Sequence, residues 1–282
     1  MNSCIFLISA RNNLLKECLT KLDSNYNKNH NYPVIIFYHG DRYDNENFRE
    51  SIREINPNTE YRFHSIIPQI PDHIEEKDLF WNLSNNYARN FRGRLGYLHA
   101  NYFWNNFMNF PELNEFDYLM RIDDDSWFKE PLEIDFFDEL DNQKGYFGTG
   151  FTWNHFGPNH LDTREQLFNW IKYYVEKYDV DVKNQQLRKS LDGPQDNSEF
   201  HTLKWNCGNL NVYNRKMFET DTWKQYLAEF NELAGGYRYR WGDCEVIGLY
   251  AYMYLDNPLI DFRLRDQGLY SPQLPNTNCV IT

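Results

Sequence analysis

The sequence predicts an α/β fold with a mostly parallel sheet, because apolar strands and amphipathic helices alternate along its first quarter. The runs at 3–10 and 32–40 have the length and side chains of buried strands, and the run at 61–67 predicts a third, short strand. Apolar residues at helical spacing separate them, over 14–22 and 46–55. Parallel strands need crossover connections of this kind, so the alternation indicates a sheet with helices on its faces.

Local chemistry sets the ends of these first elements. The opening run, "CIFLISA", stops at the polar Arg11-Asn12-Asn13, and "YPVIIFYHG" closes in a His-Gly turn. The third strand is stopped by Pro68 and Pro71, because proline cannot donate to a strand ladder.

The rest of the chain is predicted to extend the same fold. The sequence predicts an aromatic helix over 87–110, strands at 116–122 and 145–151, a helix over 163–179, a polar surface excursion at 183–200, a strand and turn at 205–214, a helix over 219–234 broken by Gly235-Gly236, and a loop that feeds a helix within 237–255. No repeat, low-complexity tract or linker divides the 282 residues, so one domain is expected.

The amino-acid composition limits the classes of partner that the protein is expected to bind. Acidic residues outnumber basic ones, 41 to 29, and the formal charge of −12 argues against nucleic acid or an anionic membrane as the main partner. Aromatic residues form 18% of the chain, which suits a sugar site but is equally explained by a biased composition. The five cysteines are an odd number without zinc-type spacing, which favours a reducing compartment and leaves one disulfide open.

Three consecutive aspartates, Asp123-Asp124-Asp125, follow the apolar strand at 116–122. Ligands of open α/β sheets bind where strands reach their carboxyl ends. Clustered carboxylates repel one another unless a cation is present, and hard cations such as Mg²⁺ and Mn²⁺ prefer oxygen ligands and bridge carboxylates to phosphates. The triplet therefore predicts a divalent cation site, and an acidic turn or helix cap is the structural alternative.

The segment "GYLHANYFWNNFMNFPELNEFDYLMRIDDDSWF" at 96–128 resembles the core of the fungal Golgi α-1,2-mannosyltransferase family. That family carries a Tyr-x-His stretch, a Phe-rich helix and a strand that ends in Arg-Val-Glu-Pro-Asp. The matching positions here are Tyr97, His99, Phe103, Pro111, Phe116, Asp117, Tyr118 and Arg121, with Asp123-Asp124-Asp125 in place of Glu-Pro-Asp.

Three further blocks extend the resemblance over nearly the whole chain in the same order. "FLISARN" resembles the first strand of the family, and "YRYRWGDCEV" contains its Arg-Trp-Gly-Asp signature at 240–243. "RDQGLYSPQLPNTNC" at 265–279 resembles its Asp-Ile-Gly-Tyr-Tyr-His-Pro-Pro pattern and the Asn-Cys that follows.

The resemblance implies a GT-A-type, Rossmann-like fold in a single domain, 1–282, with 1–125 as the nucleotide-sugar and metal-binding half and 126–282 as the acceptor-binding half. It implies a metal-dependent transfer of mannose from GDP-mannose to a glycan or glycoprotein acceptor, with Mn²⁺ or Mg²⁺ and with retention of configuration. No membrane segment is predicted. The expected location is cytoplasmic if Met1 is the native start, or the Golgi lumen if the chain is a trimmed form of an anchored enzyme.

Site residues carry over position by position. The resemblance places Asp123 and Asp125 on the metal-binding acids, Arg11 and Tyr97 on the donor nucleotide, and Asp243 on the acceptor. The full set of candidates adds Ser271 to the metal site, Asp123 and Asp124 to the donor site, and Trp241 and Trp205 to the acceptor site. The candidates for catalysis are Asp243, Glu245 and Asn211. The residues themselves offer structural alternatives: Asp243 and Glu245 also suit the first turn of a helix, and Trp205 suits a buried strand.

Two of these positions depart from the family. Ser271 replaces a histidine that helps to hold the metal, and Asn211 replaces a glutamate discussed as a nucleophile. An amide cannot act as a carboxylate nucleophile. Three possibilities follow: front-face attack, another acid such as Glu245 or Asp243, or loss of activity. The alternatives to mannose transfer are a UDP-hexose donor, a non-catalytic glycan-binding descendant and a metal-dependent phosphoesterase.

Overall fold

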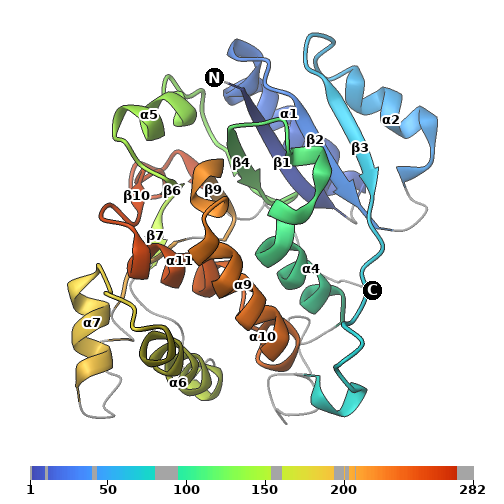
Figure 1. Ribbon diagram of the computed structural model, residues 1–282. Coiled ribbons are helices and arrows are strands. Elements are labelled where there is room, and N and C mark those ends of the chain that lie inside the picture. Colours follow the sequence, from blue (N-terminus) through green and yellow to red (C-terminus); the bar gives the residue numbers. More distant parts are fainter. Residues whose placement is uncertain are drawn as a thin grey trace.

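A seven-stranded sheet forms the centre of the protein, and helices pack on both of its faces (Figure 1). The structure is a computed structural model, and it describes residues 2–9, 12–39, 43–79, 95–153, 161–193, 200, 203–206 and 208–271. The strands of the central sheet are β1 (Ser3–Ser9), β2 (Val34–Tyr38), β3 (Tyr61–Ser65), β4 (Tyr118–Ile122), β6 (Phe147–Thr149), β9 (Leu210–Asn214) and β10 (Ile260–Asp261).

The strand order is β10-β6-β9-β4-β1-β2-β3. The four strands β4, β1, β2 and β3 run parallel, with Cys4 opposite Leu119 and Leu7 opposite Ile36. Strand β9 runs antiparallel to both β4 and β6, and β10 is parallel to β6. The predicted α/β fold with a mostly parallel sheet is confirmed, and β9 is the strand that departs from it.

Two helices flank the parallel part of the sheet on opposite faces: α1 (Asn12–Asn25) and α4 (Leu95–Asn106). The other helices are α2 (Glu46–Arg53), α5 (Phe136–Asn142), α6 (Leu161–Tyr178), α7 (Gln185–Asp192), α9 (Asp221–Leu233), α10 (Gly235–Arg238) and α11 (Asp243–Tyr254). Short 3₁₀ turns occupy Asn27–Asn29, Glu76–Asp78, Phe107–Asn109, Pro111–Leu113 and Arg215–Phe218.

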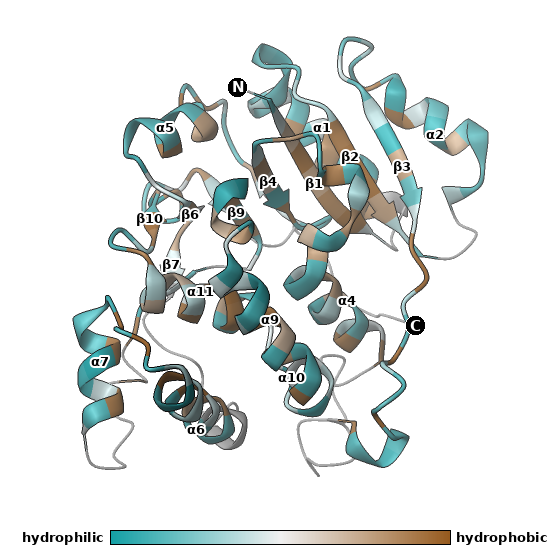
Figure 2. Cartoon of the chain, in the orientation of Figure 1, coloured by the Kyte–Doolittle hydropathy of each residue, from teal (hydrophilic) through white to brown (hydrophobic). Residues whose placement is uncertain are grey.

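Alternation along the strands explains why both faces are covered. In β1, Phe6 belongs to the same apolar cluster as Phe103 of α4, whereas Leu7 belongs to a second cluster with Leu15 of α1. Successive side chains of a strand point to opposite faces, so a strand that is apolar throughout needs cover on both. Figure 2 shows this pattern as brown central strands and largely teal outer helices.

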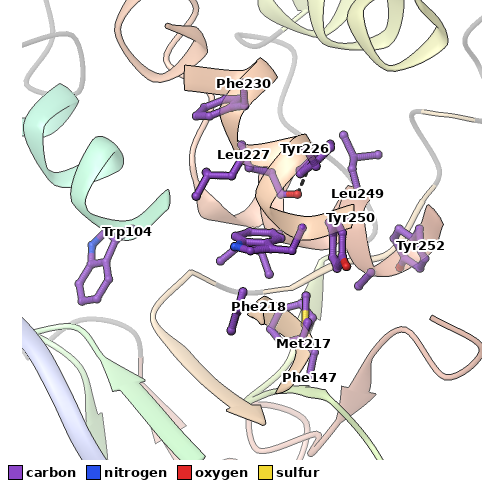
Figure 3. Packing of buried hydrophobic residues seen from close by; sticks show 14 of the residues in the cluster. Trp104, Phe147, Met217, Phe218, Tyr226, Leu227, Phe230, Leu249, Tyr250 and Tyr252 are labelled. Atoms are coloured by element: carbon purple, nitrogen blue, oxygen red, sulfur yellow. Dashed lines mark hydrogen bonds between the residues drawn. The ribbon is translucent and has the colours of Figure 1, made fainter. Parts of the chain in front are cut away.

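The second half of the chain builds its own apolar layer from α9, α11 and the residues before them. Figure 3 shows Tyr226, Leu227 and Phe230 of α9 near Leu249, Tyr250 and Tyr252 of α11, together with Met217 and Phe218. The Tyr226 hydroxyl donates to the carbonyl of Val246 over 3.0 Å. A buried tyrosine needs such a partner, so this bond fixes the spacing of the two helices.

The surface excursion predicted at 183–200 is corrected by the structure, because part of it is a helix. Residues Gln185–Asp192 form α7, and Asn184 caps it by accepting from the backbone N–H of Leu187 over 2.9 Å. Leu187 and Leu191 are buried four residues apart on one face. Two apolar residues at this spacing are enough to hold a short helix against the protein.

The helix break predicted at Gly235-Gly236 lies one residue earlier. Helix α9 ends at Leu233, the next residue, Ala234, has a left-handed φ of 57°, and the two glycines begin α10. Gly235 has a packing role: a Cβ there would lie 2.4 Å from the Trp241 ring. The glycine therefore allows the close approach of Trp241.

Two small sheets flank the central one. Strand β5 (Trp127–Phe128) pairs antiparallel with β11 (Tyr270–Ser271), and β7 (Thr152–Trp153) pairs antiparallel with β8 (Trp205–Asn206). In the described part of the chain, no helix has both the length and the apolar character that crossing a bilayer requires.

Candidate active site

The aspartate triplet forms a tight turn at the carboxyl end of β4. The backbone N–H of Ser126 donates to the Asp123 carbonyl over 3.0 Å, and the Asp123 N–H donates to the Asn209 carbonyl over 3.0 Å. The turn is thus fixed to the chain segment that leads into β9. Its position agrees with the sheet edge at which open α/β folds bind ligands.

Arg121, the penultimate residue of β4, lies under this turn. It is only 3% exposed, and its guanidinium carbon lies 3.7 Å from the centre of the Trp104 ring. Alternation along β4 directs Arg121 to the face covered by α4, where the neighbouring side chains are apolar. A buried arginine in such a place needs carboxylate partners, because an unpaired buried charge is strongly unfavourable.

Two carboxylates share the Arg121 guanidinium. Its Nη2 lies 3.0 Å from Asp123 Oδ1, and its Nη1 forms a short ion pair with Asp243 Oδ2. Burial alone lowers the pKa of Arg121, but the charges of Asp243 and Asp123 outweigh burial and raise it. The arginine therefore joins the end of β4 to the start of α11.

Asp123 is the member of the triplet that the structure leaves most accessible. Its side chain is 25% exposed, although both oxygens have partners. Oδ1 pairs with Arg121, and Oδ2 accepts from the Asn209 side-chain amide over 2.8 Å. Each carboxylate oxygen has two lone-pair directions, so these bonds leave acceptor capacity for a further ligand.

Asp124 points into the protein instead. Its Oδ2 accepts a 2.6 Å hydrogen bond from the Ser9 hydroxyl, which is also 2.7 Å from the Tyr43 hydroxyl. Ser9 is the last residue of β1. This contact holds the aspartate turn to the end of the neighbouring strand, so the placement of Asp124 is that of a structural residue of the turn.

Asp125 and Ser271, both predicted as metal ligands, are distant in sequence, and Asp125 lies in the turn before β5, the strand that pairs with the strand of Ser271. Ser271 of β11 lies opposite Trp127 of β5, two residues after Asp125. Asp125 is 8% exposed, and Ser271 is half-buried. The register therefore brings the last strand of the described chain beside the aspartate turn.

Asp243 and Asn211 lie on the other side of Arg121. Asp243 is the first residue of α11, as predicted, and burial raises its pKa while the Arg121 charge opposes the shift. Asn211 lies opposite Arg121 in the β4–β9 register, is fully buried, and has its Nδ2 3.5 Å from Asp243 Oδ2. A Cβ on Gly208 would lie 3.0 Å from Cys244 Sγ and 3.5 Å from Asp243 Oδ1, so the loop closes tightly over this pair.

Glu245 holds the start of α11. Its Oε2 accepts from the backbone N–H of Gly242 over 2.9 Å, which closes a capping interaction with the first turn. Burial raises the pKa of Glu245, and the Arg240 charge partly opposes the shift. The side chain thus takes the helix-capping place that the sequence offered as an alternative to catalysis.

The two tryptophans predicted to bind an acceptor, Trp205 and Trp241, are each 2% exposed. The Trp241 ring stacks on Tyr239 and Trp170, with centroid distances of 4.8 and 5.6 Å. Trp205 packs edge-on against Phe200, at 5.7 Å. Neither indole presents a face to solvent, so their placement supports a core role and gives no support to sugar stacking.

Tyr97 lies at the start of α4, away from the aspartate turn in sequence but beside the Arg-Trp-Gly-Asp segment. Its hydroxyl lies 3.4 Å from Arg240 Nη2, and the guanidinium carbon is 5.1 Å from the Tyr97 ring centre. Arg240 has a left-handed φ of 61°, an uncommon conformation for this residue type. Arg11, the predicted nucleotide arginine, lies outside the described residues.

The sequence alone gave no role to Ser9, Tyr43 or Trp104, and it identified Arg121 only as a position that matches the family. One signal was available for Arg121: a charged residue inside the otherwise apolar strand "YLMRI" must be buried and paired. The contacts among Ser9, Tyr43 and Asp124 join three distant segments, so no local sequence pattern predicts them.

The residues present fit a hard divalent cation as a partial ligand set. Asp123 and Asp125 supply carboxylate oxygens and Ser271 a hydroxyl oxygen, which is the donor chemistry that Mg²⁺ and Mn²⁺ prefer. Across the residues that the structure describes, no group of three or more His, Cys, Asp or Glu side chains is placed to hold a metal. A cation held by Asp123, Asp125 and Ser271 would need further oxygen ligands, which water or a substrate could supply.

A mostly parallel sheet with helices on both faces and an acidic turn after β4 is the arrangement of the GT-A fold of nucleotide-sugar glycosyltransferases. Within that class, the sequence identifies the family. The profile of the glycolipid 2-alpha-mannosyltransferase family matches residues 1–281, and the chain belongs to this family. The resemblance predicted from residues 96–128 and 240–243 is therefore confirmed.

Individual relatives are distant. Glycolipid 2-alpha-mannosyltransferase 1 of Candida albicans is 22% identical over 98% of this chain, which spans 63% of that protein. The mannosyltransferase Ktr4p of Saccharomyces cerevisiae, solved in complex with GDP, superimposes with a TM-score of 0.79 at 19% identity over 99% of this chain and 76% of its own. Core-mannan synthase A of Aspergillus fumigatus, solved in an Mn/GDP form, gives 0.76 at 17% identity over 93% and 73%.

Proposed function

We propose that this protein transfers mannose from GDP-mannose to a glycan or glycoprotein acceptor, with Mn²⁺ held at the turn after β4. One observation carries the proposal: the partly exposed carboxylate of Asp123 at the end of a central parallel strand, in a chain of this family. The relatives solved with GDP and with Mn and GDP support the choice of nucleotide and metal.

In this proposal Asp123 and Asp125 hold the cation, and Ser271 lies beside it where the family has histidine. Bound Mn²⁺ supplies electrostatic stabilisation of the diphosphate leaving group. The chain's own part is to keep the Asp123 oxygens in place, through Arg121 and Asn209, before substrate arrives. Groups fixed in advance need no reorganisation during the reaction, which is the main source of electrostatic catalysis.

The acceptor half, 126–282, is proposed to contribute Asp243 as the residue nearest the incoming hydroxyl. Its carboxylate is charge-paired with Arg121, and its position at the start of α11 is set by the Gly242–Glu245 cap. Residues 1–125 then supply the donor side and 126–282 the acceptor side of a single domain. Tyr97 and Arg11 remain proposed donor-site residues.

Retention is proposed to proceed by front-face attack. Position 211 is a fully buried amide, which cannot form a glycosyl-enzyme bond. Asp243 is held in a buried ion pair, and Glu245 caps a helix. Neither acid is oriented as a free nucleophile in this arrangement, which supports a reaction without a covalent intermediate.

A transfer assay with a matched variant pair tests the proposal. Purified protein is incubated with GDP-mannose, Mn²⁺ and methyl α-mannoside, and the disaccharide is quantified and its anomeric configuration read by NMR. We expect an α-linked product from wild type, none from Asp123→Asn, and normal activity from Asp117→Asn, whose exposed side chain precedes the same strand. Equal product from wild type and Asp123→Asn would contradict the metal assignment.

One observation favours a second candidate, a non-catalytic glycan-binding descendant: the buried amide at Asn211 where the family has glutamate. The same experiment separates the two functions. A glycan-binding protein forms no disaccharide with any nucleotide sugar, and its melting temperature rises with free mannosides but not with Mn²⁺ and GDP. Transfer from a UDP-hexose in place of GDP-mannose would keep the class of enzyme and change the donor.

A further inference from the structure

Arg121 bonds at the same time to two carboxylates that the proposed function assigns to different substrates. Asp123 belongs to the donor and cation side, and Asp243 to the acceptor side. The guanidinium is 3% exposed, so water cannot replace either partner. Among the residues that the structure describes, Asp123 and Asp243 are the two carboxylates ion-paired with Arg121, so one positive charge serves two negative ones.

We propose that Arg121 is a positioning residue that couples the two sides of the site: the charge on Asp243 determines how strongly Arg121 holds Asp123, and thereby how readily Asp123 binds a divalent cation. This inference rests on the proposed function, because it takes Asp123 as the cation ligand. It assigns Asp243 an effect on cation binding without any contact between Asp243 and the cation.

The geometry keeps the guanidinium between its two partners. The Trp104 ring stacks at 3.7 Å, and the β4–β9 register places Asn211 directly opposite Arg121. On the open side, a Cβ at Gly208 would lie 3.7 Å from Arg121 Nη1, so the loop backbone packs close to the charge pair. Arg121 can therefore redistribute its attraction between the two acids but cannot leave them.

The sign of the coupling follows from Coulomb's law. In a buried site the interaction between charges is much stronger than in water. With both acids charged, their opposing attractions hold the guanidinium between them and limit how closely it approaches Asp123. When Asp243 loses its charge, Arg121 is attracted to Asp123 alone, and an arriving cation has to compete with the whole guanidinium. Removing the charge of Asp243 therefore weakens cation binding.

Calorimetric titration of Mn²⁺ into the full chain with saturating GDP measures the effect without turnover. We expect Asp243→Asn to raise the Kd of Mn²⁺ about tenfold, within the usual range of a coupling between two sites. The matched control is Asp135→Asn, which also removes a hydrogen-bonded carboxylate, one that accepts from Tyr32 over 2.6 Å and caps α5. The control is expected to leave the Kd unchanged.

A second background tests whether the effect of Asp243→Asn passes through Arg121. Lysine at position 121 keeps the charge but lacks the planar fork that reaches two carboxylates. In the Arg121→Lys background, adding Asp243→Asn should no longer shift the Kd of Mn²⁺, because the connection between the acids is already lost. This double-mutant cycle isolates the part of the effect that passes through Arg121.

The outcomes separate the inference from the proposed function. If wild type fails to bind Mn²⁺ with GDP, the proposed function fails and this inference fails with it. If wild type binds but Asp243→Asn has the same Kd, the proposed function stands and the coupling is overturned. An equal shift in the wild-type and Arg121→Lys backgrounds also overturns it, since Asp243 would then act without the arginine.

Discussion

The parallel and antiparallel parts of the sheet contribute differently to the candidate site. The parallel part ends in a turn whose Asp123 side chain is 25% exposed and able to accept a ligand. The antiparallel side leads to Trp241, Asp243 and Glu245, which are signature or first-turn residues, and all three are engaged in packing, ion pairing or capping. These residues of the second half therefore stabilise the site and do not line its exposed surface.

Strand β4 is where the two parts meet. It pairs parallel with β1 on one side and antiparallel with β9 on the other. The side chain of Arg121 on this strand bonds both to the aspartate turn and to α11. The partly exposed aspartate turn therefore depends on the buried residues of the antiparallel side for its geometry. We expect the following variants to show that dependence.

The largest expected effect is from Arg121→Met, which leaves the buried carboxylate of Asp243 and the partly exposed carboxylate of Asp123 without the arginine that they share. We expect a loss of about 3–5 kcal/mol in the free energy of unfolding, because removing one member of a buried ion pair leaves uncompensated charge. Urea denaturation measures it. The control Arg62→Met removes an arginine paired at the surface with Glu60 and Glu115, and should cost about 1 kcal/mol or less. Similar losses in the two variants would contradict the account.

Trp241→Leu tests whether the tryptophan of the Arg-Trp-Gly-Asp signature is a core residue. The ring contacts Tyr239, Trp170 and the backbone of Gly235, and its loss leaves a cavity. We expect a loss of about 2–4 kcal/mol by thermal or urea unfolding. Tyr173→Leu, at a residue that is 54% exposed, should stay within about 0.5 kcal/mol. Full stability of Trp241→Leu with lost acceptor binding would restore the acceptor role.

Ser9→Ala tests how the parallel half fixes its own turn. The substitution removes the donor to Asp124 and leaves the Tyr43 hydroxyl without this contact. A buried hydrogen bond to a charged group contributes about 1.5–3 kcal/mol, and we expect a loss of that size in chemical denaturation. Ser24→Ala, which removes a 3.3 Å bond to the Lys21 carbonyl, should cost less. Equal costs would mean that the Ser9 contact does not hold the turn.

The smallest effect concerns pH on the donor side. Burial, with a smaller contribution from His39, lowers the pKa of His99, whose Nδ1 lies 2.8 Å from the Tyr237 hydroxyl. The folded state thus binds the proton less tightly than the unfolded chain. His99 therefore contributes stability above its ordinary pKa of about 6.5 and loses it as the pH falls through the lower, folded value.

His99→Asn should flatten this dependence while keeping a polar group near Tyr237. The melting temperature of wild type is expected to fall more steeply than that of the variant as the pH is lowered from neutrality. Parallel curves for the two proteins would show that His99 does not carry the dependence.

The sequence predicted the parallel half closely because its elements are local patterns. The strands at 3–9, 34–38 and 118–122 are mainly apolar, the short strand at 61–65 is stopped by the prolines that follow it, and the crossover helices have helical spacing. In the second half the elements are short and depend on distant contacts. Helix α7 is stabilised by only two buried leucines, and the antiparallel direction of β9 follows from a connection that no periodicity reveals.

The candidate site divides in the same way. The aspartate triplet and the start of α11 at Asp243 follow from strand ends and capping chemistry, which are local. The shared arginine, the Ser9 contact with Asp124 and the burial of Trp205 and Trp241 depend on which segments meet in three dimensions. A residue type indicates a role only when the solvent exposure of its side chain is known, and a single sequence does not give this exposure.

The most direct test of the central claim is a structure of the full chain determined with Mn²⁺ and GDP. We expect one Mn²⁺ bonded to a carboxylate oxygen of Asp123 or Asp125 and to the diphosphate, with Arg121 still bridging Asp123 and Asp243. Mn²⁺ and GDP bound elsewhere, with Asp123 contacting only Arg121 and Asn209, would contradict it.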